Sequence, residues 1–105
     1  MKKIYQKLVR DRIPEIIAAD GKSFATRKAS NTELMNYAMK KLQEEVQEFI
    51  EDPCVEEAGD IMEIFHFICD CLEIRNSEIM AEETAKRVTR GGFNEGLILE
   101  WVEEE

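Results

Sequence analysis

The sequence predicts an all-α fold, an antiparallel bundle of about four helices with short extended terminal segments. Three observations lead to this prediction. Apolar residues recur every three to four positions through much of the chain, capping or helix-breaking residues stand at the ends of these segments, and the connections are short. No internal repeat or low-complexity tract divides the 105 residues, so we predict one domain over residues 1–105.

The first predicted helix is short and the second is long. Pro14 suits the first turn of a helix over about 13–20, and Gly21 is expected to end it. Ser30 and Glu33 match a capping box, in which each side chain accepts a hydrogen bond from the other residue's backbone N–H. The box opens an amphipathic helix of about six turns. Its apolar positions are Leu34, Ala38, Leu42, Val46 and Phe49.

Two further helices are expected after this one. We expect Asp52 and Pro53 to end the long helix and to cap and start the next, so that the two are antiparallel neighbours. Asn76 begins a fourth helix that runs through about Val88, and Gly91 breaks it. The apolar segment that follows fits either a strand or a last helical turn. The apolar positions of the third helix are Val55, Ile61, Ile64, Phe65, Ile68 and Leu72.

Charge is distributed unevenly along the chain. The net charge is −9, but residues 1–41 carry 10 basic and 4 acidic side chains, whereas residues 42–105 carry 4 and 19. We expect neither duplex nucleic acid nor a membrane as a partner, because affinity for phosphate depends largely on Lys and Arg. No apolar run approaches the ~20 residues of a membrane span, and the first residues lack the apolar stretch of a signal peptide. We therefore expect a cytoplasmic protein.

The most informative feature is a pair of acidic motifs, Glu45-x-x-Glu48 and Glu57-x-x-Asp60, on the two long helices. Residues three apart lie about 60° apart around a helix, so each pair can point at one place. Glu57 falls inside the apolar stripe of its helix and Asp60 flanks it, while the other two acids border the buried side of their helix. A carboxylate in an apolar stripe is costly unless it pairs with a cation or binds a metal.

The four acids therefore predict an all-oxygen Mg²⁺ site between two antiparallel helices, in which Mn²⁺ can substitute for Mg²⁺. The alternative is that they belong to ordinary solvated helix faces, as we expect of the neighbouring acids Glu44, Glu51, Glu56 and Glu63. The predicted metal ligands are Glu45, Glu48, Glu57 and Asp60.

Two other kinds of metal site are disfavoured. Cys69 and Cys71 point about 200° apart on a helix, so they cannot share a zinc ion with His66. Glu63 and His66 give only one Glu-x-x-His motif, where a ferritin-like di-iron site needs two, and this histidine faces away from the acidic motifs. We expect His66 to be partly exposed or to lie at an interface. We expect Cys54, Cys69 and Cys71 to be buried free thiols.

Two basic groups are candidates for binding phosphate, because arginine forks suit phosphate oxygens and glycines let a ligand approach the backbone. A helix end that is rich in Lys and Arg and followed by Gly is equally an ordinary capping arrangement. We expect Lys40 and Lys41 to be only solvated charges. The candidate phosphate-binding residues are Lys7, Arg10, Lys86, Arg87 and Arg90.

Taken in order, these motifs resemble the all-α nucleoside triphosphate pyrophosphohydrolases, which include MazG, dimeric dUTPases and phosphoribosyl-ATP pyrophosphohydrolase. The chain is most similar to small MazG-like proteins of the phosphoribosyl-ATP pyrophosphohydrolase-like type. One departure is that eight residues separate the two acidic motifs, fewer than is typical, so Glu44 and Glu56 are alternative ligands. The resemblance is carried by Lys7-Leu8-Val9-Arg10-Asp11-Arg12-Ile13-Pro14-Glu15-Ile16-Ile17, Glu44-Glu45-x-x-Glu48, Glu56-Glu57-x-x-Asp60 and Arg90-Gly91-Gly92-Phe93.

The resemblance implies a MazG-like fold and a Mg²⁺-dependent hydrolase that acts on a phosphoric anhydride. Its substrate would be a nucleoside triphosphate or a nucleotide like phosphoribosyl-ATP, cleaved to the monophosphate and pyrophosphate as nucleotide-pool house-cleaning. Glu45 and Glu48 would be the catalytic carboxylates. Either another bound ion or a free carboxylate such as Glu48 would orient and deprotonate the attacking water. Arg10 and Arg90 are the first candidates for holding the leaving pyrophosphate.

Two expectations concern partners. Helices of this length leave apolar side chains such as Phe65, Phe67, Met80 and Trp101 without a cover, so we expect a homo-oligomer, a dimer or a tetramer. A non-enzymatic alternative is an acidic helical adaptor or a regulatory protein on the same scaffold. That alternative explains the net charge of −9 but not a carboxylate inside an apolar stripe.

Overall fold

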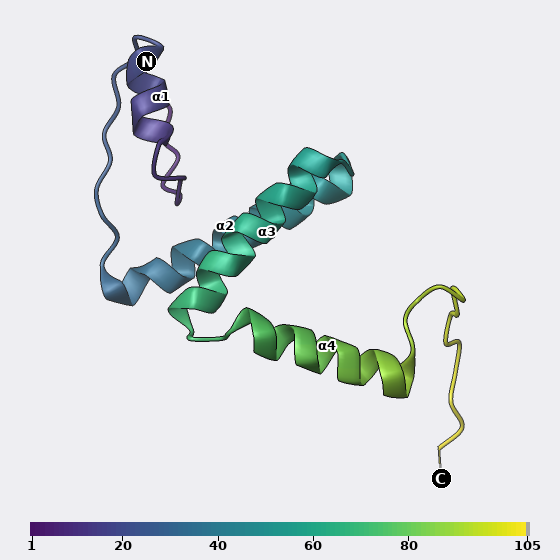
Figure 1. The fold of residues 1–105 in the computed structure, drawn as a ribbon. Helices are drawn as coiled ribbons and strands as arrows, with labels where there is room; N and C mark the ends of the chain where they lie inside the picture. The colour runs from purple at the N-terminus through teal and green to yellow at the C-terminus, as the bar shows by residue number, and fades with distance from the viewer. Residues whose placement is uncertain (105) are drawn as a thin grey trace. The chain divides into compact units, whose positions relative to one another are not determined.

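The computed structural model describes residues 1–104, in which four helices and no strands form (Figure 1). The predicted all-α fold with four helices is confirmed. Among the described residues, no helix is both long and apolar enough to cross a membrane. The helices are α1 (Ile13–Ala19), α2 (Asn31–Glu51), α3 (Val55–Cys71) and α4 (Asn76–Arg90).

The chain forms two compact units, one of residues 1–72 and one that begins at residue 73. The first unit contains α1, α2 and α3, and the second contains α4 and the tail that follows it. All four acids of the predicted metal site belong to the first unit, whereas Lys86, Arg87 and Arg90 belong to the second.

α2 begins at the predicted capping box. The backbone N–H of Glu33 donates to Ser30 Oγ at 3.3 Å, and the backbone N–H of Ser30 donates to Glu33 Oε1 at 3.0 Å. Arg27 adds an ion pair to the same carboxylate. The hydrogen bond from Arg27, together with that from the Ser30 backbone, holds the pKa of Glu33 below its ordinary value. The start of the longest helix is therefore fixed by charge-assisted hydrogen bonds.

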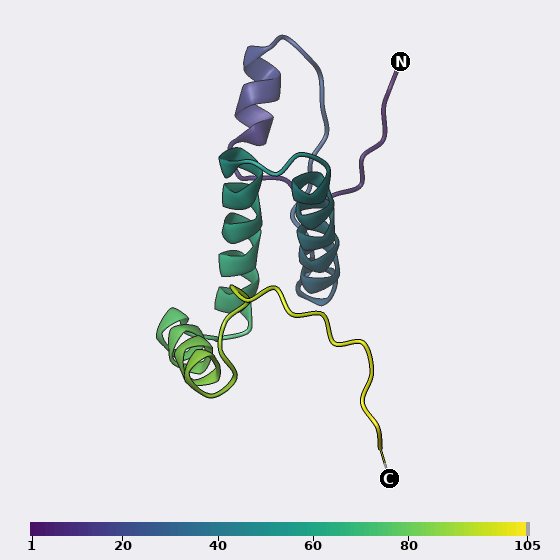
Figure 2. The same cartoon turned by 90° about the vertical axis from the view of Figure 1, so that its right-hand side faces the viewer.

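Pro53 separates α2 from α3. The residue before a proline is pushed out of the α conformation, and Asp52 accordingly has φ −143° and ψ 78°. α3 begins at Val55 with Cys54 as its N-cap residue, so the prediction that Asp52 and Pro53 cap and start this helix places the start too early. Because only residues 52–54 connect the two helices, the chain reverses direction and α2 packs side by side with α3 (Figure 2).

A small apolar core lies between α2 and α3. Ala38, Ile64 and Ile68 are buried together, and Cys69 is buried as well. The other predicted apolar positions Leu34, Leu42, Phe49, Ile61 and Phe65 are partly buried. Leu8, which precedes α1 in the chain, packs against the core, as do Met35 and Leu42.

Three predicted core positions are wrong, because Val46, Val55 and Leu72 are exposed. Val55, the first residue of α3, is 90% exposed. Two of the three cysteines also differ from the prediction. Cys69 is a buried free thiol, but Cys54 and Cys71 are exposed. Cys71 follows Cys69 by two residues, about 200° around the helix, so the two cannot share the buried side.

The ends of α1 and α4 agree with the glycine signals. α1 has its proline in the first turn and is followed by Gly21 at φ +76°. α4 runs to Arg90, two residues beyond the predicted Val88, and stops at Gly91, where φ is +81°. The tail over residues 91–104 contains neither the strand nor the last helical turn that the sequence allows.

Replacing Ser30 by alanine is expected to lower the free energy of unfolding by about 1 kcal/mol, because the first turn of α2 loses its capping acceptor. Urea denaturation followed by circular dichroism measures this loss. Ser23→Ala, an exposed serine in the preceding loop, is the control and should change the midpoint little. Equal effects of the two substitutions would contradict a specific capping role.

Candidate metal site

Four carboxylates converge where α2 lies against α3. α2 contributes Glu45 and Glu48, one turn apart, and α3 contributes Glu57 and Asp60 with the same spacing. One carboxylate oxygen from each residue lies within 4.8 Å of the corresponding oxygens of the other three. We call these four residues the acidic cluster. A group of oxygens this close together has the donor type and spacing to hold a metal ion.

The burial of the acidic cluster makes it unlike an ordinary acidic helix surface. Glu45 is only 6% exposed, and the other three residues are partly buried. Glu45 Oε2 and Glu57 Oε2 are both inaccessible to solvent and have no hydrogen-bond partner among the described residues. Leaving a buried carboxylate oxygen unpartnered is costly. A divalent cation held by these carboxylates would offset that cost, so the residues present fit a hard metal ion.

The structure separates the cluster from the alternative ligands Glu44 and Glu56. Lys7 Nζ donates to Glu44 Oε1 at 2.8 Å, and Lys41 Nζ approaches Glu44 Oε2 at 3.4 Å. The hydrogen bond from Lys7 holds the pKa of Glu44 below its ordinary value despite some burial. Glu56 is exposed on α3. This fold therefore brings Glu45 and Glu57 together in the cluster, and not Glu44 and Glu56.

Lys41 is a member of the site that the sequence analysis missed. Its side chain is only 18% exposed, and its Nζ lies 3.0 Å from Glu45 Oε1. Burial alone would lower the pKa of Lys41, but the hydrogen bonds and charges of Glu45 and Glu44 outweigh burial and raise it. The expectation that Lys41 is merely solvated is wrong. The sequence signal for this contact is that Lys41 stands four residues before Glu45, because side chains at that spacing meet on one helix face.

Arg10, from the segment before α1, also contacts the cluster. Its Nη2 donates to Asp60 Oδ1 at 2.8 Å, although fifty residues separate the two in the chain. Lys7 and Arg10, which the sequence marks as phosphate candidates, therefore both contact carboxylates of the long helices in this structure. The cluster has two cationic neighbours, Lys41 on Glu45 and Arg10 on Asp60.

The two other acids of the cluster have raised pKa values. The pKa of Glu48 is raised by its hydrogen-bonding contact with Glu45 and by the negative charge of that neighbour. The pKa of Glu57 is raised by burial and then by the charge of Asp60. The hydrogen bond, burial and the neighbouring negative charges therefore make Glu48 and Glu57 retain protons more readily than isolated glutamates would.

The three basic candidates on α4 lie in the second unit. Lys86 Nζ is 3.6 Å from Glu82 Oε1, and Arg87 Nη2 is 3.9 Å from Glu83 Oε1. Both are exposed ion pairs between successive turns of one helix, and Arg90 is exposed at the last residue of α4. Exposed ion pairs of this kind are weak, so Lys86 and Arg87 can exchange their carboxylate partners for another anion.

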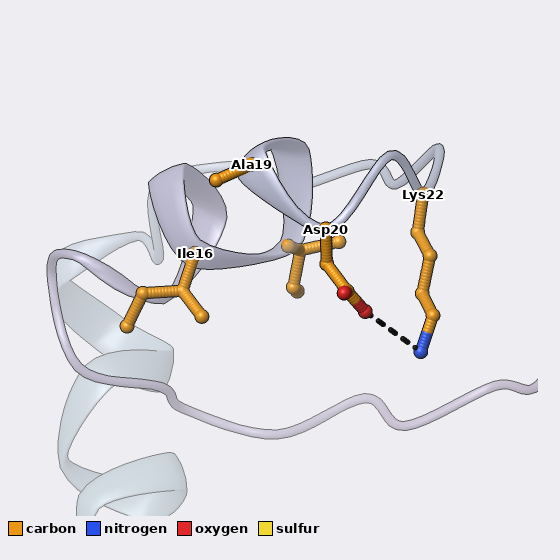
Figure 3. A pocket seen from close by; sticks show the side chains of 5 residues that line it. Ile16, Ala19, Asp20 and Lys22 are labelled. Carbon is orange, nitrogen blue, oxygen red and sulfur yellow. Dashed lines mark ion pairs between the residues drawn. The ribbon is translucent and has the colours of Figure 1, made fainter.

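A separate pocket lies beside α1 and is not part of the acidic cluster (Figure 3). Its polar groups form one ion pair, between Lys22 Nζ and Asp20 Oδ2 at 3.2 Å. None of the four clustered acids lines it, so it offers no comparable set of oxygen ligands. The lining residues are Ile16, Ile17, Ala19, Asp20 and Lys22.

No protein-family model, curated protein or solved structure matches the chain. The resemblance to the MazG-like pyrophosphohydrolases therefore rests on the ordered motifs of this sequence. The functional interpretation rests on those motifs together with the geometry of the acidic cluster.

Glu57→Gln is expected to raise the melting temperature of the metal-free protein at neutral pH, because the substitution removes one charge from a repelling, partly buried group. A carboxyl whose folded-state pKa is raised destabilises the fold once it ionises. The difference from the wild type should thus be small below pH 4.5, the ordinary value, and should grow as pH rises through the raised pKa of Glu57.

Thermal denaturation in chelator at pH 4 and pH 7.5 measures this difference. Glu63→Gln, an exposed glutamate on the same helix, is the control and should leave the melting temperature nearly unchanged at both pH values. A Glu57→Gln variant that is less stable than the wild type at pH 7.5 would show that the cluster is not under repulsion.

Proposed function

We propose that the chain is a Mg²⁺-dependent nucleoside triphosphate pyrophosphohydrolase of the MazG-like type. The observation that carries the proposal is the convergence of four carboxylates, with one oxygen of each within 4.8 Å of the others. Two carboxylate oxygens of these residues are also buried with no hydrogen-bond partner in the described part of the chain. Hard oxygen donors favour Mg²⁺, and Mn²⁺ can take its place. The substrate class is a nucleoside triphosphate or a nucleotide such as phosphoribosyl-ATP, and the products are the monophosphate and pyrophosphate.

In this proposal the four acids hold the metal, and the bound ion supplies charge neutralisation to the phosphate oxygens and activation of water. Glu45 and Glu48 act as the catalytic carboxylates. Glu48 is partly exposed, so its oxygens can orient a water molecule at the edge of the cluster and accept its proton. Glu45 is buried and held by Lys41, which fixes the position of its carboxylate.

The basic residues would bind the phosphates and the leaving pyrophosphate. Arg10 is the best placed of them, because its guanidinium already contacts a cluster residue and remains more than half exposed. A planar guanidinium can donate two hydrogen bonds to one phosphate group. Lys7 is the other candidate of the first unit, and Lys86, Arg87 and Arg90 are separate candidates for binding phosphate on the second unit.

Pyrophosphate release from a panel of ribo-, deoxyribo- and modified nucleoside triphosphates, with phosphoribosyl-ATP included, tests this function. We expect release from at least one member in Mg²⁺ and none in chelator. Glu57→Gln should reduce the release to background without unfolding the protein, because one of the buried oxygen ligands is lost. Glu63→Gln, exposed on the same helix, should retain the activity.

Two results would contradict the proposal. Loss of turnover in Glu63→Gln but not in Glu57→Gln would overturn the assignment of the ligands. Silence across the whole panel, with no rise of the melting temperature in Mg²⁺, would favour the acidic adaptor instead, because a ligand that binds the native state stabilises it.

We also propose that the protein is a homo-oligomer, a dimer or a tetramer. Large apolar side chains are exposed on both long helices although these helices pack against each other, and such surfaces are unusual in a monomer. Light scattering at micromolar protein concentration should give a multiple of the 12.2 kDa chain mass. A monomer mass would contradict this proposal. The exposed residues include Met39, Val46 and Ile50 of α2 and Val55, Met62 and Phe67 of α3.

A further inference from the structure

Arg10 is an unusual neighbour for an acid that belongs to a candidate metal site. It comes from the segment before α1, and its Nη2 donates to Asp60 Oδ1 at 2.8 Å. Asp60 contributes one of the four oxygens that lie within 4.8 Å of one another. A positive side chain is therefore paired with one of the carboxylates of the cluster. It must either remain there when a cation binds or move away.

The two cationic neighbours of the cluster differ in how firmly they are held. Lys41 lies on the same helix as its partners, is 18% exposed and contacts both Glu44 and Glu45. The side chain of Arg10 is 54% exposed and makes one ion-pair contact, with a carboxylate that is itself 32% exposed. An exposed ion pair of this kind is weak, because water screens it and a long side chain loses freedom in forming it.

A divalent cation competes with Arg10 for the same carboxylate. It carries twice the charge of a guanidinium, and at the distance between cluster oxygens the two cations would repel each other. Asp60 gains more from the divalent ion because that ion is also bound by the three other acids. Lys41 does not face this competition to the same degree, since Glu44 lies outside the cluster and holds its other side.

We propose that Arg10 is an exchangeable counter-ion of the acidic cluster, paired with Asp60 in the metal-free protein and released by divalent cation binding to bind a phosphate group beside the metal. This inference rests on the proposed function, because it requires the cluster to bind a cation. It adds that cation and phosphate binding support each other through one side chain. An anion that holds Arg10 removes the competitor from Asp60, and by linkage the cation favours the anion equally.

Arginine side-chain NMR of ¹⁵N-labelled protein tests the exchange without relying on turnover. Mg²⁺ is titrated in a buffer free of phosphate, and Asp60→Asn in the absence of metal supplies the reference signal of an unpaired Arg10. We expect Mg²⁺ to move the guanidinium signal of Arg10 toward that reference. Arg12 is the matched control, since it lies two residues away and its Nε is 3.5 Å from Glu15 Oε2, outside the cluster. Its signal should not move.

The ¹³C carboxyl signals of Glu45 and Glu57 report metal binding independently in the same titration. If these signals shift while Arg10 keeps its metal-free position, the exchange is wrong and the metal-binding function stands. If they do not shift at saturating Mg²⁺, the proposed function and the exchange are both overturned. The two failures are therefore distinguishable in one experiment.

Calorimetry with Mg²⁺ alone gives a second measurement. Arg10→Gln should tighten Mg²⁺ binding about two- to fivefold, the range expected when a weak competing ion pair is removed. Arg12→Gln should leave the dissociation constant unchanged, although it removes the same charge from the same segment. Unchanged or weaker Mg²⁺ binding in Arg10→Gln would overturn the exchange, because Arg10 would then support the metal-binding geometry of Asp60.

Discussion

The packing of α2 against α3 is the constraint on which the acidic cluster depends, because each helix supplies only half of its carboxylates. Pro53 forces the chain out of the helical conformation at Asp52, and the reversal is complete within residues 52–54. With so short a connection, the last turns of α2 must face the first turns of α3. The short spacing between the two acidic motifs is thus what brings them to one level of the helix pair.

The cluster opposes the folding that creates it. The buried apolar core is small, with Ala38, Ile64, Ile68 and Cys69 as its members, and the carboxylate-bearing Glu45 is buried as well. Isolated sites that break the rule of apolar interiors are most often functional, because stability alone would remove them. Lys41 and Arg10 reduce the repulsion, but two buried carboxylate oxygens have no hydrogen-bond partner within the part of the chain that the structure describes.

Local sequence patterns were sufficient to predict most of the fold and the four acids of the site, but not their contacts with basic side chains. Periodicity and caps located four helices, and the spacing of three residues placed each acidic pair on one helix face. Periodicity does not say how much of a face the partner helix covers, which is why Val46 is exposed. The contact of Arg10 with Asp60 joins positions fifty residues apart and depends on how the N-terminal segment docks, which no local pattern encodes.

The uneven charge of the chain acquires a structural meaning from these contacts. Basic side chains of the N-terminal part already have partners within the protein. Lys7 pairs with Glu44 on α2, and Arg10 pairs with Asp60 on α3. Under the proposed function, internal carboxylates and external phosphates would be alternative partners for the same basic side chains. Whichever partner held these side chains would also change the charge next to the cluster, so anion binding and cation binding would depend on each other under the proposed function.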